Sequence, residues 1–116
     1  MTITGVGVDL EEIDQFRRTK YSDNKRFYEK LFTTAEIGYC LKKTDPYLHF
    51  AVRFCAKEAF IKASGLSVKD FKKIEVVMRD GRPCMKTSLI KEVVHLSLSH
   101  SEDTAIAVVV IERLHC

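Results

Sequence analysis

The feature that most constrains the fold is a segment near the middle of the chain that is apolar on almost every side of a helix. Apolar residues from 50 to 63 are spread around the helix, and such a helix is normally buried. The segment nevertheless contains two pairs of charges four residues apart, Arg53 with Lys57 and Glu58 with Lys62, so each pair shares a face. Because a buried ionised group is costly unless paired or bound to an ion, the helix contains either internal salt bridges or a ligand site.

The first residues predict a strand that ends in a carboxylate. Residues 3–10 alternate as a strand does, with Gly5 and Gly7 interspersed, and reach Asp9 near the end. Glycine in a strand allows close approach of another backbone or of a ligand. Asp9 fits two roles, the N-cap of a helix over residues 10–18 or a metal ligand.

A third segment combines histidine with serine near the end of the chain. Residues 95–101 alternate between leucine and serine, which predicts a half-buried strand. The strand ends at His100, beside the hydroxyls of Ser99 and Ser101. His100 is therefore either a surface residue or part of a polar site. A second strand, 104–112, follows a short turn.

The remaining patterns predict an α+β fold with helices and an antiparallel sheet. Thr33 and Glu36 form a capping-box pattern, and the central helix begins at Asp45-Pro46 and ends at Ser64-Gly65. Residues 88–94 fit a short helix or a loop. Further helices are expected over 10–18, 24–31 and 33–43, and further strands over 73–78 and 83–86, joined by a turn at Asp80-Gly81.

Composition places the chain among globular proteins. Its 116 residues suit one domain over residues 1–116, and 46% are hydrophobic and 30% charged. It contains no apolar run long enough to cross a bilayer and no signal-peptide pattern, so we expect a cytoplasmic protein without a membrane partner. The four cysteines lack metal-ligand spacing and are expected to be reduced thiols.

Together these segments resemble a known family. The sequence contains G-V-D at 7–9, R-F-x-A-K-E-A-x-x-K-A at 53–63, H-x-S-x-S-H at 95–100 and I-E-R-L at 111–114. This order, with Arg26-Phe27 in the first third and Gly81-Arg82-Pro83 ahead of the H-x-S-x-S-H segment, resembles the holo-(acyl carrier protein) synthase family of 4'-phosphopantetheinyl transferases. The resemblance spans nearly the whole chain.

The resemblance implies a reaction and a catalytic site. It implies transfer of 4'-phosphopantetheine from coenzyme A to a serine of an apo acyl carrier protein, with Mg²⁺ as cofactor and adenosine 3',5'-bisphosphate released. Asp9 and Glu58 match the two metal ligands, and carboxylates are ligands that Mg²⁺ prefers. Lys62 matches a lysine that approaches the phosphates, which makes the expected catalytic residues Asp9, Glu58 and Lys62.

The resemblance also implies a cofactor site between the subunits of a homotrimer. Lys57 has an alternative role, pairing with a carboxylate. Glu36 matches a candidate near the metal, but we favour its role in the capping box. The residues expected to contact the cofactor are Arg53, Lys57, Lys62, Gly65, Gly81, Arg82, Pro83, Ser99 and His100.

Carrier recognition is expected to depend on charge. The chain has a formal net charge of +3, and Arg17, Arg18 and Arg26 are the expected docking residues for an acidic carrier. Residues 11–15 are acidic where relatives have an arginine, so the usual docking contact is absent here. The expected carrier is therefore either an acyl carrier protein or a related carrier domain, such as one from a polyketide or peptide assembly line.

Two alternatives to the transferase remain open. One is a module that binds coenzyme A or a nucleotide without transferring it. The other is a nucleic-acid-binding domain, but the chain lacks a basic motif interleaved with aromatic residues. We therefore expect no nucleic-acid partner.

Overall fold

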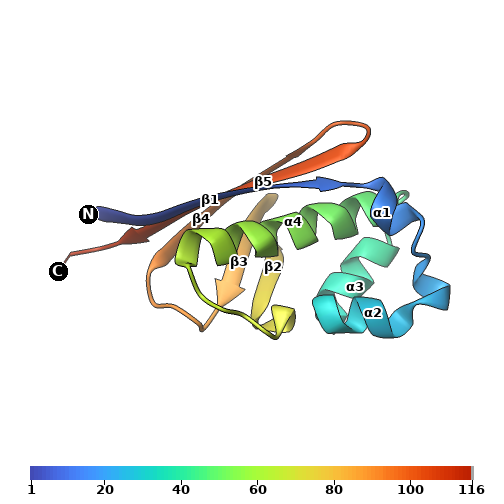
Figure 1. Cartoon of the computed structure of the whole chain (residues 1–116), viewed down its shortest axis with the longest axis horizontal. Helices are drawn as coiled ribbons and strands as arrows, with labels where there is room; N and C mark the ends of the chain where they lie inside the picture. Colours follow the sequence, from blue (N-terminus) through green and yellow to red (C-terminus); the bar gives the residue numbers. More distant parts are fainter. Residues whose placement is uncertain (116) are drawn as a thin grey trace.

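The computed structural model, which describes residues 1–115, places one long helix against a three-stranded sheet (Figure 1). The helix is α4 (Pro46–Ser64). The strands β1 (Thr2–Glu12), β5 (Thr104–Arg113) and β4 (Val93–His100) are antiparallel and lie in the order β1-β5-β4. This arrangement confirms the expected α+β class with an antiparallel sheet and a buried central helix.

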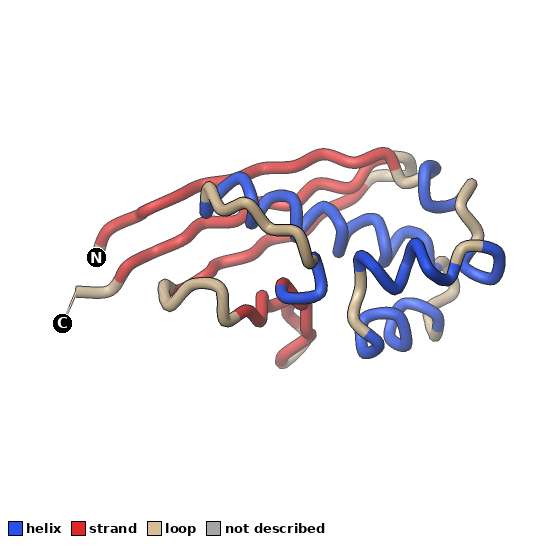
Figure 2. The backbone as a smooth tube through the Cα atoms, turned by 60° about the horizontal axis from the view of Figure 1, so that its bottom comes forward, coloured by secondary structure: helices blue, strands red, loops and turns tan. Residues whose placement is uncertain are grey.

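The other elements lie on the side of the sheet that α4 covers (Figures 1 and 2). Strands β2 (Ile74–Arg79) and β3 (Arg82–Thr87) form a separate hairpin. Its turn has positive φ at Asp80 and Gly81, as the sequence predicted. The short helical elements are α1 (Asp14–Arg17), η1 (Tyr21–Asp23), α2 (Lys25–Leu31), α3 (Thr34–Leu41) and η2 (Phe71–Lys73).

The boundaries of α4 agree with their sequence signals. The Asp45 side chain accepts a hydrogen bond from the Leu48 amide, and Pro46 occupies the first turn. The helix ends at Gly65, whose φ of 70° is left-handed. Residues on several sides of α4 are buried, as its apolar composition predicted. No helix within residues 1–115 is long and apolar enough to cross a membrane.

One prediction about local structure is corrected, and one that was left open between two alternatives is decided. Strand β1 continues to Glu12 because its pairing with β5 extends to Thr104, so the predicted helix over 10–18 is reduced to α1. Asp9 therefore lies within a strand and caps no helix. Residues 88–92 form a loop rather than a helix, and β4 begins at Val93 because Val93 already pairs with Glu112 of β5.

Strand β1 and helix α4 approach each other unusually closely. A Cβ atom added at Gly5 would overlap the Ala63 carbonyl, and one added at Gly7 would overlap the Ala59 carbonyl. Both glycines are therefore required by the proximity of the two backbones rather than by a positive φ.

We expect Gly7→Ala to destabilise the protein because the added methyl group overlaps backbone atoms that cannot move independently. The loss in free energy of unfolding should reach about 1–3 kcal/mol or more, measured by urea denaturation. Gly38→Ala in α3 is the matched control, because nothing lies within 4 Å of its added Cβ. It should raise stability by about 0.5–1 kcal/mol, since alanine favours a helix. Equal effects of both substitutions would contradict this account of the β1–α4 contact.

Candidate functional site

The β1–α4 contact brings Asp9 against the side chains of α4. Lys62 Nζ donates to Asp9 Oδ1 at 2.9 Å and to the Val8 carbonyl at 3.2 Å. Asp9 is only 7% exposed, whereas the side chain of Lys62 is 55% exposed. Asp9 Oδ2 is buried and has no hydrogen-bond partner. Because buried polar atoms are usually paired, this oxygen is suited to binding a ligand.

Glu58 adds a second carboxylate one helical turn before Lys62. Burial, and then the charge of Asp9, raises the pKa of Glu58, and Lys62 partly opposes this rise. Burial alone would raise the pKa of Asp9, but the neighbouring Glu11 and the ammonium of Lys62, which donates to Asp9, hold it below its ordinary value. The predicted catalytic residues Asp9, Glu58 and Lys62 therefore influence one another electrostatically.

The donors at this point suit a hard divalent cation. Mg²⁺ is commonly bound by one or two carboxylates together with water and substrate phosphates. Asp9 Oδ2 has no competing partner, and Glu58 supplies a second carboxylate from a different element. Within residues 1–115, no three or more His, Cys, Asp or Glu side chains are arranged to hold a metal ion by themselves. The residues present fit Mg²⁺ with water and phosphate as the remaining ligands.

Glu11 is a third carboxylate that our sequence analysis did not assign to this site. It lies two residues after Asp9 on the same face of β1, and Gln15 Nε2 donates to its Oε1 at 2.9 Å. Burial, and then the neighbouring carboxylate of Asp9, raises the pKa of Glu11 to about 7. The period-two spacing would have placed Glu11 here if the strand had been extended to Glu12.

Glu11 should make the stability of the ligand-free protein depend on pH. Its pKa is raised from 4.5 to about 7 in the folded chain, so its contribution is present below about pH 4.5 and is lost as pH rises through 7. We expect Glu11→Gln, which resembles the protonated side chain, to raise the melting temperature more at pH 8 than at pH 5. The exposed residue Glu29 supplies the control substitution, Glu29→Gln. An identical gain for Glu11→Gln at both pH values would contradict the assignment.

Arg53 and His100 lie near His49 rather than near Asp9, and Arg53 is buried. The Arg53 guanidinium lies 4.2 Å from the centre of the Tyr39 ring, its Nη1 donates to the His49 carbonyl, and its buried Nε has no partner. Burial, followed by the charges of Arg53, Lys43 and His100, lowers the pKa of His49. Arg53 and Lys62 are nine residues apart on α4, which places them on opposite faces of the helix.

The ammonium of Lys57 is fully buried, which favours its alternative role, pairing with a carboxylate, over the predicted contact with the cofactor. It forms a salt bridge of 2.6 Å with Glu36 and donates to the carbonyls of Leu31 and Phe71 at 2.8 and 3.1 Å. These contacts use all three donors of the ammonium. The salt-bridge interpretation of the charges on α4 is thus correct for Lys57, although its partner lies on another helix.

Glu36 connects three elements. Its carboxylate accepts from the Thr33 amide, which completes the predicted capping box, and from the Val76 amide at 2.9 Å. The preferred role of Glu36 as a capping residue is confirmed, and its second contact anchors β2 to α3.

The other predicted cofactor contacts are distributed over the chain. Arg82 and Pro83 line a cavity of about 390 Å³ together with residues 94–98 of β4. Ser99 is on β4, Gly81 is in the turn between β2 and β3, and Gly65 ends α4. One chain therefore does not bring all predicted contacts into a single cleft.

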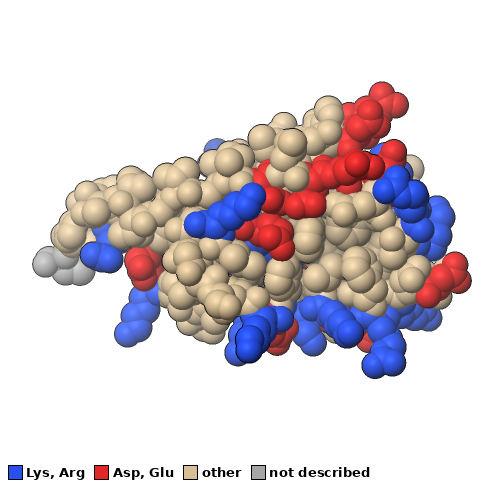
Figure 3. Space-filling view, viewed as in Figure 1, with Lys and Arg blue, Asp and Glu red and all other residues tan. Residues whose placement is uncertain are grey.

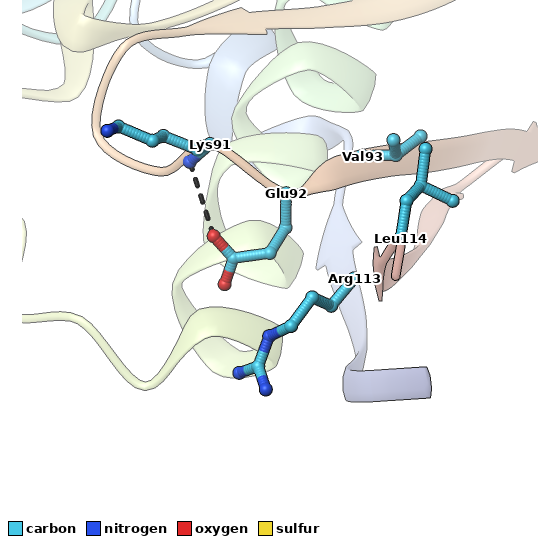
Figure 4. Close-up of a pocket in the computed structure, with 5 residues that line it drawn as sticks. All are labelled: Lys91, Glu92, Val93, Arg113 and Leu114. Atoms are coloured by element: carbon cyan, nitrogen blue, oxygen red, sulfur yellow. Dashed lines mark hydrogen bonds between the residues drawn. The ribbon is translucent and has the colours of Figure 1, made fainter. Parts of the chain in front are cut away.

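Two other cavities differ in their relation to the site. A largely apolar groove of about 450 Å³ reaches Glu58 and is lined by Gln15, Phe16, Thr19, Phe27, Leu31, Phe54 and Phe71. A second cavity of about 420 Å³ lies where β4 begins and β5 ends, and its lining includes Lys91, Glu92 and Arg113 (Figure 4). None of the predicted site residues lines the second cavity.

The predicted docking arginines differ in their ion pairs. Arg17 contacts Asp14 at 2.9 Å and Asp45 at 2.8 Å. Arg18 contacts Glu12 at 3.5 Å, whereas exposed Arg26 has no ion pair within residues 1–115. Figure 3 shows acidic side chains gathered where β1 ends and basic side chains along the rim formed by α2.

Comparison with known proteins identifies the family. Residues 5–109 match the model of the 4'-phosphopantetheinyl transferase superfamily. The chain is 39% identical to a holo-[acyl-carrier-protein] synthase of Geobacter sulfurreducens, over 96% of this chain and 98% of the relative. This chain belongs to the holo-(acyl carrier protein) synthase family of 4'-phosphopantetheinyl transferases.

Solved structures of family members have the same fold. The holo-(acyl-carrier-protein) synthase of Bacillus anthracis, in complex with CoA (3',5'-ADP), matches with a TM-score of 0.84 and 33% identity. That match covers 96% of this chain and 97% of the other. The enzyme of Neisseria meningitidis matches with a TM-score of 0.85 and 28% identity, over 97% and 100%. The holo-(acyl carrier protein) synthase fold is therefore established for this chain.

Proposed function

We propose that this protein transfers 4'-phosphopantetheine from coenzyme A to a serine of an apo acyl carrier protein. The reaction requires Mg²⁺ and releases adenosine 3',5'-bisphosphate. The observation that supports it most strongly is the buried, unpartnered Oδ2 of Asp9, on a carboxylate that contacts Lys62 and influences the pKa of Glu58, in a member of this family.

The three residues have separate roles. Asp9 and Glu58 would hold the metal ion, which supplies positive charge beside the pyrophosphate of coenzyme A. Lys62 is half exposed, so its ammonium can turn from Asp9 toward a bound phosphate and neutralise charge there. Phosphoryl transfer depends mainly on such positioning and charge neutralisation rather than on covalent help from the protein.

A trimer with cofactor sites between subunits is part of the proposal. It would allow Lys62 of one subunit and Arg53 of another, which lie on opposite faces of α4, to contact one coenzyme A molecule. It would also cover apolar side chains that one chain exposes on its sheet, namely Ile3, Val6, Val8, Leu10, Val93 and Val108. A monomeric mass from light scattering of the intact protein would contradict this assembly.

The transfer itself is tested by the intact mass of an apo carrier protein after incubation with this protein, coenzyme A and Mg²⁺. We expect a gain equal to phosphopantetheine that disappears when a chelator is added. Asp9→Ala and Glu58→Ala should each reduce the rate by at least about 100-fold, because removal of one electrostatic partner from such a site commonly costs that much.

Carrier proteins from fatty-acid synthesis and from assembly lines should be tested in parallel. Binding of coenzyme A without any mass gain on these carriers would instead favour a binding module. Full Mg²⁺-dependent activity in either alanine variant would contradict the proposed metal ligands.

Docking of the carrier should depend more on Arg26 than on Arg18. Arg26 is unpaired within residues 1–115, whereas Arg18 has Glu12 beside it. Arg26→Ala should raise the carrier KM several-fold and weaken its dependence on salt, because the positive charge on Arg26 would steer an acidic partner. Arg18→Ala is the control and should change the carrier KM less. The opposite order would show that α1 provides the main docking contact.

A further inference from the structure

The thiol of Cys55 lies directly beneath Asp9. Cys55 is fully buried on α4, three residues before Glu58, and its Sγ donates to the Asp9 carbonyl at 3.0 Å. The Ala105 carbonyl of β5 lies 3.6 Å from the same sulfur. The thiol therefore connects the helix that carries Glu58 to β1, on which Asp9 lies, and to the neighbouring strand β5.

Cys55 is the third position in a regular contact between α4 and β1. Ala63 lies against Gly5, Ala59 against Gly7, and Cys55 against Asp9. Four helical residues advance about 6 Å and two strand residues about 6.6 Å, so each turn of α4 meets every second residue of β1. The first two contacts are steric, and the third is a hydrogen bond.

Two side chains of α4 contact Asp9, and we expect only one of these contacts to persist when coenzyme A binds. Lys62 is half exposed and is expected to turn toward phosphate when coenzyme A binds. Cys55 is inaccessible to solvent, and its thiol donates to the backbone carbonyl of Asp9. When Lys62 leaves Asp9, the contact from Cys55 remains.

We propose that Cys55 is a positioning residue for the cation site. Its thiol holds the backbone of Asp9 against α4, so that the Asp9 carboxylate stays close to Glu58 whether or not Lys62 contacts it. This inference rests on the proposed function, because it assumes that Asp9 and Glu58 bind one cation. A cysteine that only fills space in the core would need no hydrogen-bond donor.

The test compares Mn²⁺ binding by the intact protein and its variants, measured by calorimetry or by the electron paramagnetic resonance of free Mn²⁺. Cys55→Ala and Cys55→Val remove the donor, and Val keeps the core filled. Both should weaken Mn²⁺ binding roughly tenfold, as does loss of partners that orient metal ligands. Cys55→Ser keeps a donor and should stay close to the original affinity.

Cys40→Ala supplies the matched control. Cys40 is the other fully buried thiol within residues 1–115, and it makes no hydrogen bond with Asp9 or Glu58. Its substitution should lower thermal stability but leave Mn²⁺ affinity unchanged. If Cys55→Ala fails to fold, Cys55→Val keeps the test decisive, because it also removes the donor and keeps the core filled.

The positioning role is overturned if Cys55→Val binds Mn²⁺ as tightly as the unmodified protein. It is also overturned if Cys55→Ser is as weak as Cys55→Val. If the unmodified protein and Cys55→Val bind Mn²⁺ equally well, the cation site remains and only the role of Cys55 is removed. Failure of the unmodified protein to bind Mn²⁺ at all would remove the cation site and this inference together.

Discussion

The close contact between β1 and α4 is the constraint on which the site depends. Gly5 and Gly7 lack side chains, so the strand lies directly against Ala59 and Ala63 of the helix. At this distance the carboxylate of Asp9 is within hydrogen-bonding reach of Lys62. A larger residue at either glycine would move the strand outward and separate the charges that the site needs.

The contact between β1 and α4 also brings several carboxylates together in a partly buried site. Asp9, Glu11 and Glu58 influence one another, and within the described chain the ammonium of Lys62 contacts Asp9 alone among them. Burial and mutual repulsion raise the pKa of Glu11 and Glu58. The ligand-free site is therefore electrostatically incomplete, and a divalent cation with bound phosphates has the charge and the chemistry to complete it.

Helix boundaries that depend on a few neighbouring residues could be predicted from the sequence. Pro46 and Gly65 set the ends of α4, and Thr33 with Glu36 set the start of α3. The end of β1 could not be predicted, because pairing with β5 overrides the helical preference of residues 10–12. The partner of Lys57 was also hidden, because Glu36 is 21 residues away and only the folded chain brings the two together.

The candidate site was predictable in its residue types but not in its arrangement. The motifs supplied Asp9, Glu58 and Lys62, and the fold brings them close together. Glu11 was missed because the strand was predicted to end before it. The distribution of Arg53, His100 and Arg82 over other surfaces follows from the helical period and from the separate hairpin, which no local pattern specifies.

The most direct measurement is a double-mutant cycle of Mn²⁺ affinity for Asp9→Asn and Glu58→Gln. The account predicts one Mn²⁺ site per chain, whose affinity either substitution lowers strongly. The loss of binding free energy in the double variant should not exceed the sum of the two single losses, because both carboxylates bind one ion. Mn²⁺ binding that remains at its original affinity in either single variant would show that Asp9 and Glu58 do not share a cation. That result would contradict the central claim.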